Sequence, residues 1–129
     1  MDCSKKQVRI WEKVVGVDAH PDVFTALELQ GSVFDNTRLW LDTDVPVKDY
    51  RKWLTRHDFK DSVLVFESSA NSFELTRLAR QAGVKAIVID SRKIGQIRKA
   101  YCENDKMAAE KIALAYLGGM AHKSEVWQP

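Results

Sequence analysis

The stretch Val14-Val15-Gly16-Val17-Asp18-Ala19-His20 decides the fold. Its first four residues form a short apolar run rich in β-branched valine, which is typical of a buried strand. Asp18 follows where that strand must end, so we expect a carboxylate at the rim of a core. The alternative is that Asp18 only opens the turn before Pro21, because aspartate often hydrogen-bonds the backbone beyond a strand end.

A second apolar run has the same pattern. Residues 62–66 are continuous and mostly apolar, and they end on Glu67, which is followed by small polar residues. In open α/β sheets the functional crevice lies outside the carboxyl ends of the strands, so acids at two such ends converge when the strands are parallel neighbours. Because Mg²⁺ binds one or two carboxylates together with water and phosphate oxygens, the pair indicates phosphoryl chemistry on a metal ion.

Composition is that of one ordinary globular domain. The chain has 129 residues, of which 45% are hydrophobic and 29% charged. No apolar run reaches membrane-spanning length and no signal-peptide core is present, so we expect a cytoplasmic protein with no membrane partner. The formal net charge of +2 does not by itself argue for nucleic acid. Cys3 and Cys102 lack partners at metal-ligand spacing and are interpreted as free thiols.

The order of predicted elements specifies the fold class. Period-two patterning over residues 23–30, a turn at Gly31 and a third strand over residues 33–41 predict an antiparallel meander. A helix entered through Pro46 and extending to His57 then leads to the strand at 62–66, which should lie parallel to the first strand. A second helix is predicted to be capped by Asn71 with Glu74, to end at Gly83, and to precede a strand over residues 84–89.

The remaining residues are expected to be helical. Ser91 can cap a short basic helix, and Asn104 or Asp105 can cap a last helix through residues 107–116 that ends at Gly118-Gly119. The resulting order, βββαβαβ followed by helices, predicts an α/β fold with a mixed sheet of the ribonuclease H-like (RuvC-like) class and flanking helices. In that fold the first and fourth strands are neighbours, which would place Asp18 beside Glu67.

Five short motifs in this order carry a family resemblance. They are Val-Gly-Val-Asp-Ala-His, Phe-Glu-Ser-Ser-Ala-Asn, Ile-Asp-Ser-Arg-Lys-Ile, Asn-Asp-Lys-Met-Ala-Ala-Glu-Lys-Ile-Ala and Glu-Val-Trp-Gln-Pro. Together they resemble the N-terminal domain of the DEDD insertion-sequence transposases, relatives of Piv-type site-specific invertases, over residues 14–129. The resemblance implies metal-dependent chemistry on DNA with Mg²⁺ or Mn²⁺, host or guide-RNA participation, and self-assembly into dimers or higher forms.

The resemblance also implies which residues bind the metal. The first three acids of the family fall on Asp18, Glu67 and Asp105, which would be both catalytic residues and metal ligands. The fourth acid normally lies one helical turn further on, and this position is Ala108 here. Glu110 points well round the helix and is not expected to replace it. Asp105 could instead be a plain helix cap, since Asp is among the best caps.

Other polar residues have weaker assignments. Basic residues around the third acid could contact DNA phosphates with release of counterions, or could form a solvated face: Arg92, Lys93, Arg98, Lys99 and Lys106. His20 could be a ligand or proton shuttle, but a lone histidine beside a turn is more often structural. His57 and His122 are assigned no chemistry, and Ser68 and Ser69 lack the histidine that a nucleophilic serine needs.

We therefore expect a polar segment over residues 1–12, a RuvC-like domain over 13–120, and the start of a linker to a second domain over 121–129. The first functional hypothesis is a catalytic-domain fragment of a DNA transposase or site-specific recombinase that performs metal-dependent phosphodiester chemistry. The alternative is a catalytically impaired module of the same fold that binds nucleic acid or partner subunits, because Ala108 breaks the acidic set. An actin-like or sugar-kinase half is disfavoured by the lack of a glycine-rich phosphate loop.

Overall fold

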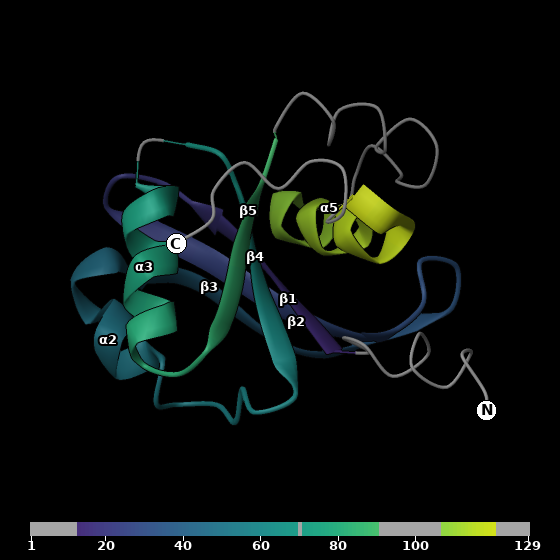
Figure 1. Cartoon of the computed structure of the whole chain (residues 1–129), viewed down its shortest axis with the longest axis horizontal. Coiled ribbons are helices and arrows are strands. Elements are labelled where there is room, and N and C mark those ends of the chain that lie inside the picture. Colours follow the sequence, from purple (N-terminus) through teal and green to yellow (C-terminus); the bar gives the residue numbers. More distant parts are fainter. Residues whose placement is uncertain (1–12, 70, 91–106, 121–129) are drawn as a thin grey trace.

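A computed structural model describes residues 13–69, 71–90 and 107–120 of the chain (Figure 1). The strands are β1 (Lys13–Ala19), β2 (Val23–Gly31), β3 (Asn36–Pro46), β4 (Ser62–Glu67) and β5 (Lys85–Ile89). The helices are the 3₁₀ turn η1 (Val47–Asp49), α2 (Tyr50–Trp53), α3 (Ser72–Gln81), α5 (Ala108–Ala115) and the π-helical turn η2 (Tyr116–Met120).

The strands form one mixed sheet in the order β3-β2-β1-β4-β5. β1 pairs antiparallel with β2, and β2 pairs antiparallel with β3, as expected for a meander. β4 lies parallel to β1, and β5 lies parallel to β4. The predicted fold class, a mixed α/β sheet with flanking helices in which the first and fourth strands are neighbours, is therefore confirmed.

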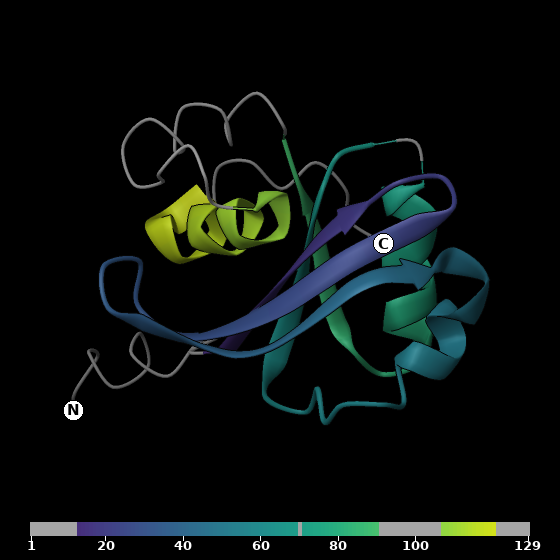
Figure 2. The same cartoon turned by 180° about the vertical axis from the view of Figure 1, so that it is seen from behind.

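Helices cover both faces of this sheet. α2 and α3 lie on one face, and α5 lies on the other (Figures 1 and 2). Successive strand residues point to opposite faces. Val15 of β1 and Phe66 of β4 consequently pack in the core beneath α2 and α3, whereas Val14 and Val65 pack in the core beneath α5. Central strands buried on both faces explain why β1 and β4 are continuous apolar runs.

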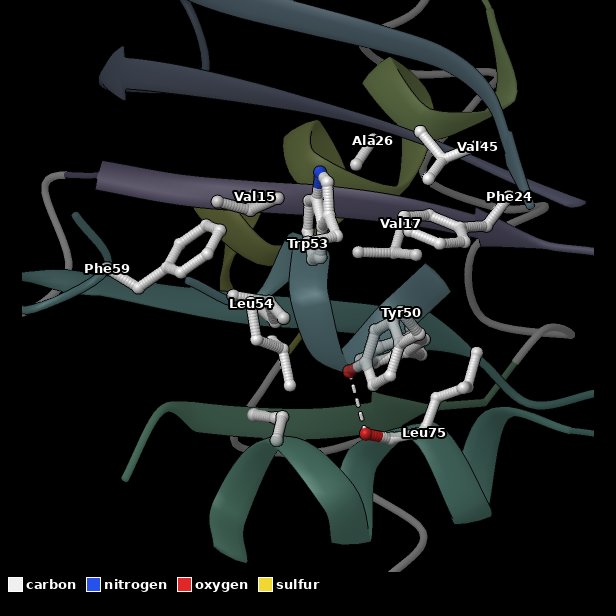
Figure 3. Packing of buried hydrophobic residues seen from close by; sticks show 14 of the residues in the cluster. Val15, Val17, Phe24, Ala26, Val45, Tyr50, Trp53, Leu54, Phe59 and Leu75 are labelled. Atoms are coloured by element: carbon white, nitrogen blue, oxygen red, sulfur yellow. Dashed lines mark hydrogen bonds between the residues drawn. The ribbon is translucent and has the colours of Figure 1, made fainter. Parts of the chain in front are cut away.

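Trp53 is at the centre of the core beneath α2 and α3. Its side chain is fully buried, and its ring packs against Phe24 and Phe59 with centroid distances of 4.9 and 5.2 Å (Figure 3). Tyr50 is equally buried, and its hydroxyl donates a 2.7 Å hydrogen bond to the carbonyl of Leu75 on α3. Burial raises the pKa of the Tyr50 hydroxyl, so this group remains a neutral donor. The bond joins α2 to α3.

β3 begins and ends later than predicted. The loop before it is closed by side-chain bonds, because Asn36 donates to the carbonyl of Ser32 at 2.8 Å and the Ser32 hydroxyl accepts from the amide of Asp35. The strand then continues to Pro46 through a bulge. Asp44 has a positive φ of 54°, and its amide donates to the hydroxyl of Thr25. The bulge interrupts the pairing with β2 between Phe24 and Ala26, and the pairing resumes where Val45 lies opposite Phe24.

The helix predicted from Pro46 to His57 is shorter than expected. It consists of η1 and α2, and single turns continue as far as Arg56, whose amide donates to the carbonyl of Trp53. The period-3.6 pattern marks the buried face correctly. His57 leaves the helix because its ring bonds to Asp42 of β3 instead.

The predicted start of α3 is correct in position, since Asn71 is its N-cap residue, but the predicted capping bonds are absent. Asn71 precedes α3 but makes no capping bond, and Glu74 pairs with Arg77 rather than with the helix start. Instead, the Ser72 hydroxyl accepts a hydrogen bond from the backbone amide of Ser69, and this bond closes the turn before α3. The predicted stop at Gly83 is confirmed by its φ of +84°.

The last helix also begins differently from the prediction. α5 begins at Ala108, and its N-cap is the extended residue Met107 rather than Asn104 or Asp105. Gly118 and Gly119 were predicted to end this helix, but they lie within the π-helical turn η2, which continues to Met120. The predicted segment 1–12 and the predicted short helix after Ser91 fall outside the described residues.

Candidate metal site

Asp18 and Glu67 lie at the carboxyl ends of two neighbouring parallel strands, as the second-last residue of β1 and the last residue of β4. The register pairs Val17 of β1 with Phe66 of β4, so the next residue on each strand is one of the two acids. Adjacent strands lie about 4.8 Å apart, which brings the two backbones close enough for both carboxylates to approach one ion. The expected pairing of these acids at one edge of the sheet follows from this register.

Both acids belong to the face of the sheet that α5 covers. Asp18 has the same parity as Val14 and Gly16, and Glu67 has the same parity as Val65. Gly16 permits a very close approach, because a Cβ atom there would lie 1.9 Å from the carbonyl oxygen of Ala109. α5 is thereby held against the strand that carries Asp18.

The loops at this edge are tied together by hydrogen bonds. His20 Nε2 lies 3.0 Å from Asp18 Oδ2, and the side-chain amide of Asn71 donates to the carbonyl oxygen of His20 at 2.9 Å. The Asp18 side chain remains 27% exposed, so its carboxylate is accessible from solvent. The loop after β1 and the start of α3 therefore hold Asp18 in place. Sequence reasoning missed Asn71 in this role because its position suggested a helix cap.

A further acid, Asp90, follows β5 at the same edge. β5 is parallel to β4, with Glu67 opposite Ile89, and the amide of Ser68 donates to the carbonyl of Ile89 at 3.0 Å. Asp90 is half-buried. Asp90 follows an apolar run just as Asp18 and Glu67 do, but it has the same parity as Val88, which packs in the core beneath α2 and α3.

The third predicted ligand, Asp105, lies outside the described residues. Within 13–69, 71–90 and 107–120, no cluster of three histidine, cysteine or acidic side chains could hold a metal ion. Asp18 and Glu67 are hard oxygen donors suited to Mg²⁺ or Mn²⁺, and they need further oxygen ligands from outside that set. Glu110 is directed elsewhere, since its carboxylate contacts the guanidinium of Arg38 at 3.5 Å.

The other predicted contacts are not described either. The basic residues assigned to DNA binding, namely Arg92, Lys93, Arg98, Lys99 and Lys106, lie outside the described residues. None of the helices in the described part of the chain has the length and apolar character needed to cross a bilayer.

A separate polar cluster surrounds Asp42 on β3. Trp53 Nε1 and His57 Nε2 both lie 2.8 Å from Asp42 Oδ2, and an Arg56 guanidinium nitrogen lies 3.7 Å from the same oxygen. Burial tends to raise the pKa of Asp42, but the bonds from His57 and Trp53 and the charges of His57 and Arg56 outweigh it and hold that pKa below its usual value. The His57 ring stacks on Trp40 at 3.8 Å. This cluster fastens the chain after α2 to the sheet.

The fold has known structural relatives, although the sequence has none that is close. No family model matches the chain, and no curated protein is significantly similar to it. The structure of T. thermophilus RuvC in complex with a Holliday junction substrate superposes with a TM-score of 0.54 at 13% identity, over 88% of this chain and 98% of that one. A second Thermus thermophilus RuvC structure gives 0.52 at 12% identity, over 90% and 84%. The chain therefore has a RuvC-like, ribonuclease H-like fold.

Proposed function

We propose that this chain is a metal-dependent, DNA-cleaving catalytic domain of the DEDD transposase or site-specific recombinase type. The observation that supports it is the placement of Asp18 and Glu67 at the carboxyl ends of neighbouring parallel strands, on the face that α5 covers. The RuvC-like fold adds support, since one structure with this fold is a complex with a Holliday junction substrate.

In this proposal Asp18, Glu67 and Asp105 hold Mg²⁺ or Mn²⁺. When bound, the ion would supply Lewis-acid activation of a water molecule or hydroxyl against a DNA phosphodiester. His20 and Asn71 would hold Asp18 in place for binding the ion, through the hydrogen bonds described above. The close contact of Gly16 with Ala109 keeps α5 against the strand that carries Asp18.

The rest of the proposed organisation follows the sequence resemblance. Residues 13–120 form the catalytic domain, residues 1–12 form a polar extension, and residues 121–129 begin a linker to a second domain. The chain acts in the cytoplasm on DNA, assembles with copies of itself and works with a host factor or guide RNA. The basic residues from Arg92 to Lys106 contact DNA phosphates beside the metal.

A second candidate function is a module that binds nucleic acid or partner subunits without cutting. The observation that favours it is Ala108, which stands where the family has its fourth acid and is the first residue of α5. Glu110 cannot compensate, because its carboxylate lies against Arg38. With three acids a single ion can be held, while a two-metal clamp on the attacking and leaving oxygens would be weakened.

Calorimetric titration with Mn²⁺ tests the metal site. We expect binding by the unchanged protein, loss of that binding in Asp18→Asn, and no change in the control Asp61→Asn, which removes an exposed acid before β4. Equal binding by all three proteins, or none by any, would overturn the proposal. Incubation with labelled branched DNA and Mn²⁺ then separates the two candidates, since only the nuclease gives strand breaks that disappear in Asp18→Asn.

A further inference from the structure

Four cations face outward on one side of the η1–α2 segment. Lys48, Arg51, Lys52 and Arg56 are all exposed, and we call them the α2 basic face. From this face we infer a second nucleic-acid contact surface, which holds the phosphate backbone of DNA away from the metal site. The inference rests on the proposed action on DNA.

Helical spacing brings these cations together. They recur at intervals of three, one and four residues along η1, α2 and the turn that follows, and all four are exposed. The opposite side is apolar and buried through Tyr50, Trp53 and Leu54. Every residue of the segment that faces the core is therefore apolar or aromatic, and its charge is concentrated on the outer side.

Little of this positive charge is neutralised locally. Arg56 contacts Asp42 at 3.7 Å, and that carboxylate also bonds Trp53 and His57. Among the described residues, no carboxylate lies within 4 Å of the side-chain nitrogens of Lys48, Arg51 or Lys52.

The charge of this short segment exceeds that of the whole protein. Residues 47–56 contain four cations and a single acid, Asp49, while the full chain has a formal net charge of only +2. Acids from other segments near this face are Asp42, which contacts Arg56 at 3.7 Å, and Asp22, whose backbone carbonyl accepts the amide of Val47. Glu74 on α3 is paired with Arg77. Positive charge is therefore segregated here, as expected of a phosphate-binding surface on a nearly neutral protein.

The backbone that carries the cations is held rigidly. The Tyr50 hydroxyl bonds the carbonyl of Leu75, and Trp53 is clamped between Phe24 and Phe59 (Figure 3). A rigid scaffold reduces the ordering cost that flexible charged side chains impose on binding.

The α2 basic face is close in the fold to the edge that bears the acids. The amide of Val47 donates to the carbonyl of Asp22 at 2.9 Å, and Asp22 belongs to the loop that follows Asp18. α2 lies on the face of the sheet opposite α5 (Figure 2), so DNA held there would contact the domain at a second place.

A pair of double variants with equal charge tests the inference. Lys48→Gln/Lys52→Gln removes two cations from the α2 basic face. Lys60→Gln/Lys85→Gln removes two exposed lysines near the amino ends of β4 and β5, at the other end of the sheet. Binding of a fluorescent duplex of about 20 base pairs is measured by anisotropy across a salt series without divalent metal. The absence of metal separates binding from cleavage.

We expect the first double variant to bind DNA about tenfold more weakly at low salt. The slope of log binding constant against log salt concentration should be smaller in magnitude by about 1.8, because each lost phosphate contact reduces it by about 0.9. The control should match the unchanged protein. Equal weakening in both variants would mean that only net charge matters and would overturn the inference, as would failure of the unchanged protein to bind DNA. If both doubles bind alike while cleavage still requires Asp18, the proposed function stands and this inference fails.

Discussion

Gly16 on β1 lies directly against the backbone of Ala109 on α5. A Cβ atom at Gly16 would be 1.9 Å from the carbonyl oxygen of Ala109 and 2.8 Å from the amide nitrogen of Ala113. Both atoms belong to the backbone, so no side chain can rotate away to make room. Glycine at this position therefore sets the separation between the helix and the strand that ends at Asp18.

We predict that Gly16→Ala lowers the free energy of unfolding by at least about 3 kcal/mol, because α5 must move off the sheet. Urea denaturation measures the change. The matched control is Gly83→Ala, where a Cβ has open space but the φ of +84° is unfavourable for alanine, and we expect a loss of about 1 to 2 kcal/mol. Similar losses in the two variants would show that α5 does not contact β1 at Gly16.

The sequence predicts the elements whose pattern is local and repetitive. β1 and β4 are apolar runs of strand length, and the meander and the helical crossover fix their parallel pairing, so the neighbourhood of Asp18 and Glu67 follows from chain order alone. The close contact between Gly16 and α5 does not follow, because a glycine within an apolar run gives no sign of the helix that covers it.

Other features depend on long-range partners that a local pattern does not contain. The alternating pattern over residues 23–30 gives no sign that Glu28 is buried, yet it is 4% exposed because β2 is covered on both faces. Its carboxylate accepts bonds from Trp40 Nε1 at 2.8 Å and from the Ser62 hydroxyl. Asn71 was interpreted as a cap because helix starts favour asparagine. Its side-chain amide donates instead to the backbone carbonyl of His20, which belongs to another loop.

Asn71→Ala is predicted to weaken Mn²⁺ binding about tenfold, because the loop that carries His20 and orients Asp18 loses its anchor. Stability should fall by only about 1 kcal/mol, since no helix-capping bond is lost. Asn36→Ala is the control, as it removes a comparable 2.8 Å bond from the β2–β3 loop. Calorimetry should show unchanged metal affinity in that variant, and an equal loss of affinity in both would refute the role of Asn71.

Ala108→Asp introduces an acid at the first residue of α5. We predict Mn²⁺ affinity about tenfold or more higher, because an added carboxylate increases the charge and number of oxygen ligands. A carboxylate in the first turn of a helix also adds about 0.3 to 1 kcal/mol through the helix dipole. Ala108→Asn supplies a similar shape without the charge, and its titration should match the unchanged protein. A gain with Asn equal to that with Asp would argue against a missing ligand.

Asp42 gives the fold an acid-sensitive contact. Because its pKa is held below the usual value in the folded state, protonation is easier in the unfolded chain. The charged Asp42 carboxylate therefore contributes its full stabilisation above about pH 4, near the pKa of an unfolded aspartate. This contribution is lost as the pH falls below that value and passes the lowered pKa of the folded state. We predict that unfolding free energies measured in urea between pH 7 and 2.5 decline less steeply below pH 4 in Asp42→Asn than in the unchanged protein. Asp61→Asn, at an exposed position, should keep the original slope. Parallel curves for all three proteins would show that the bonds from His57 and Trp53 to Asp42 do not stabilise its charged form.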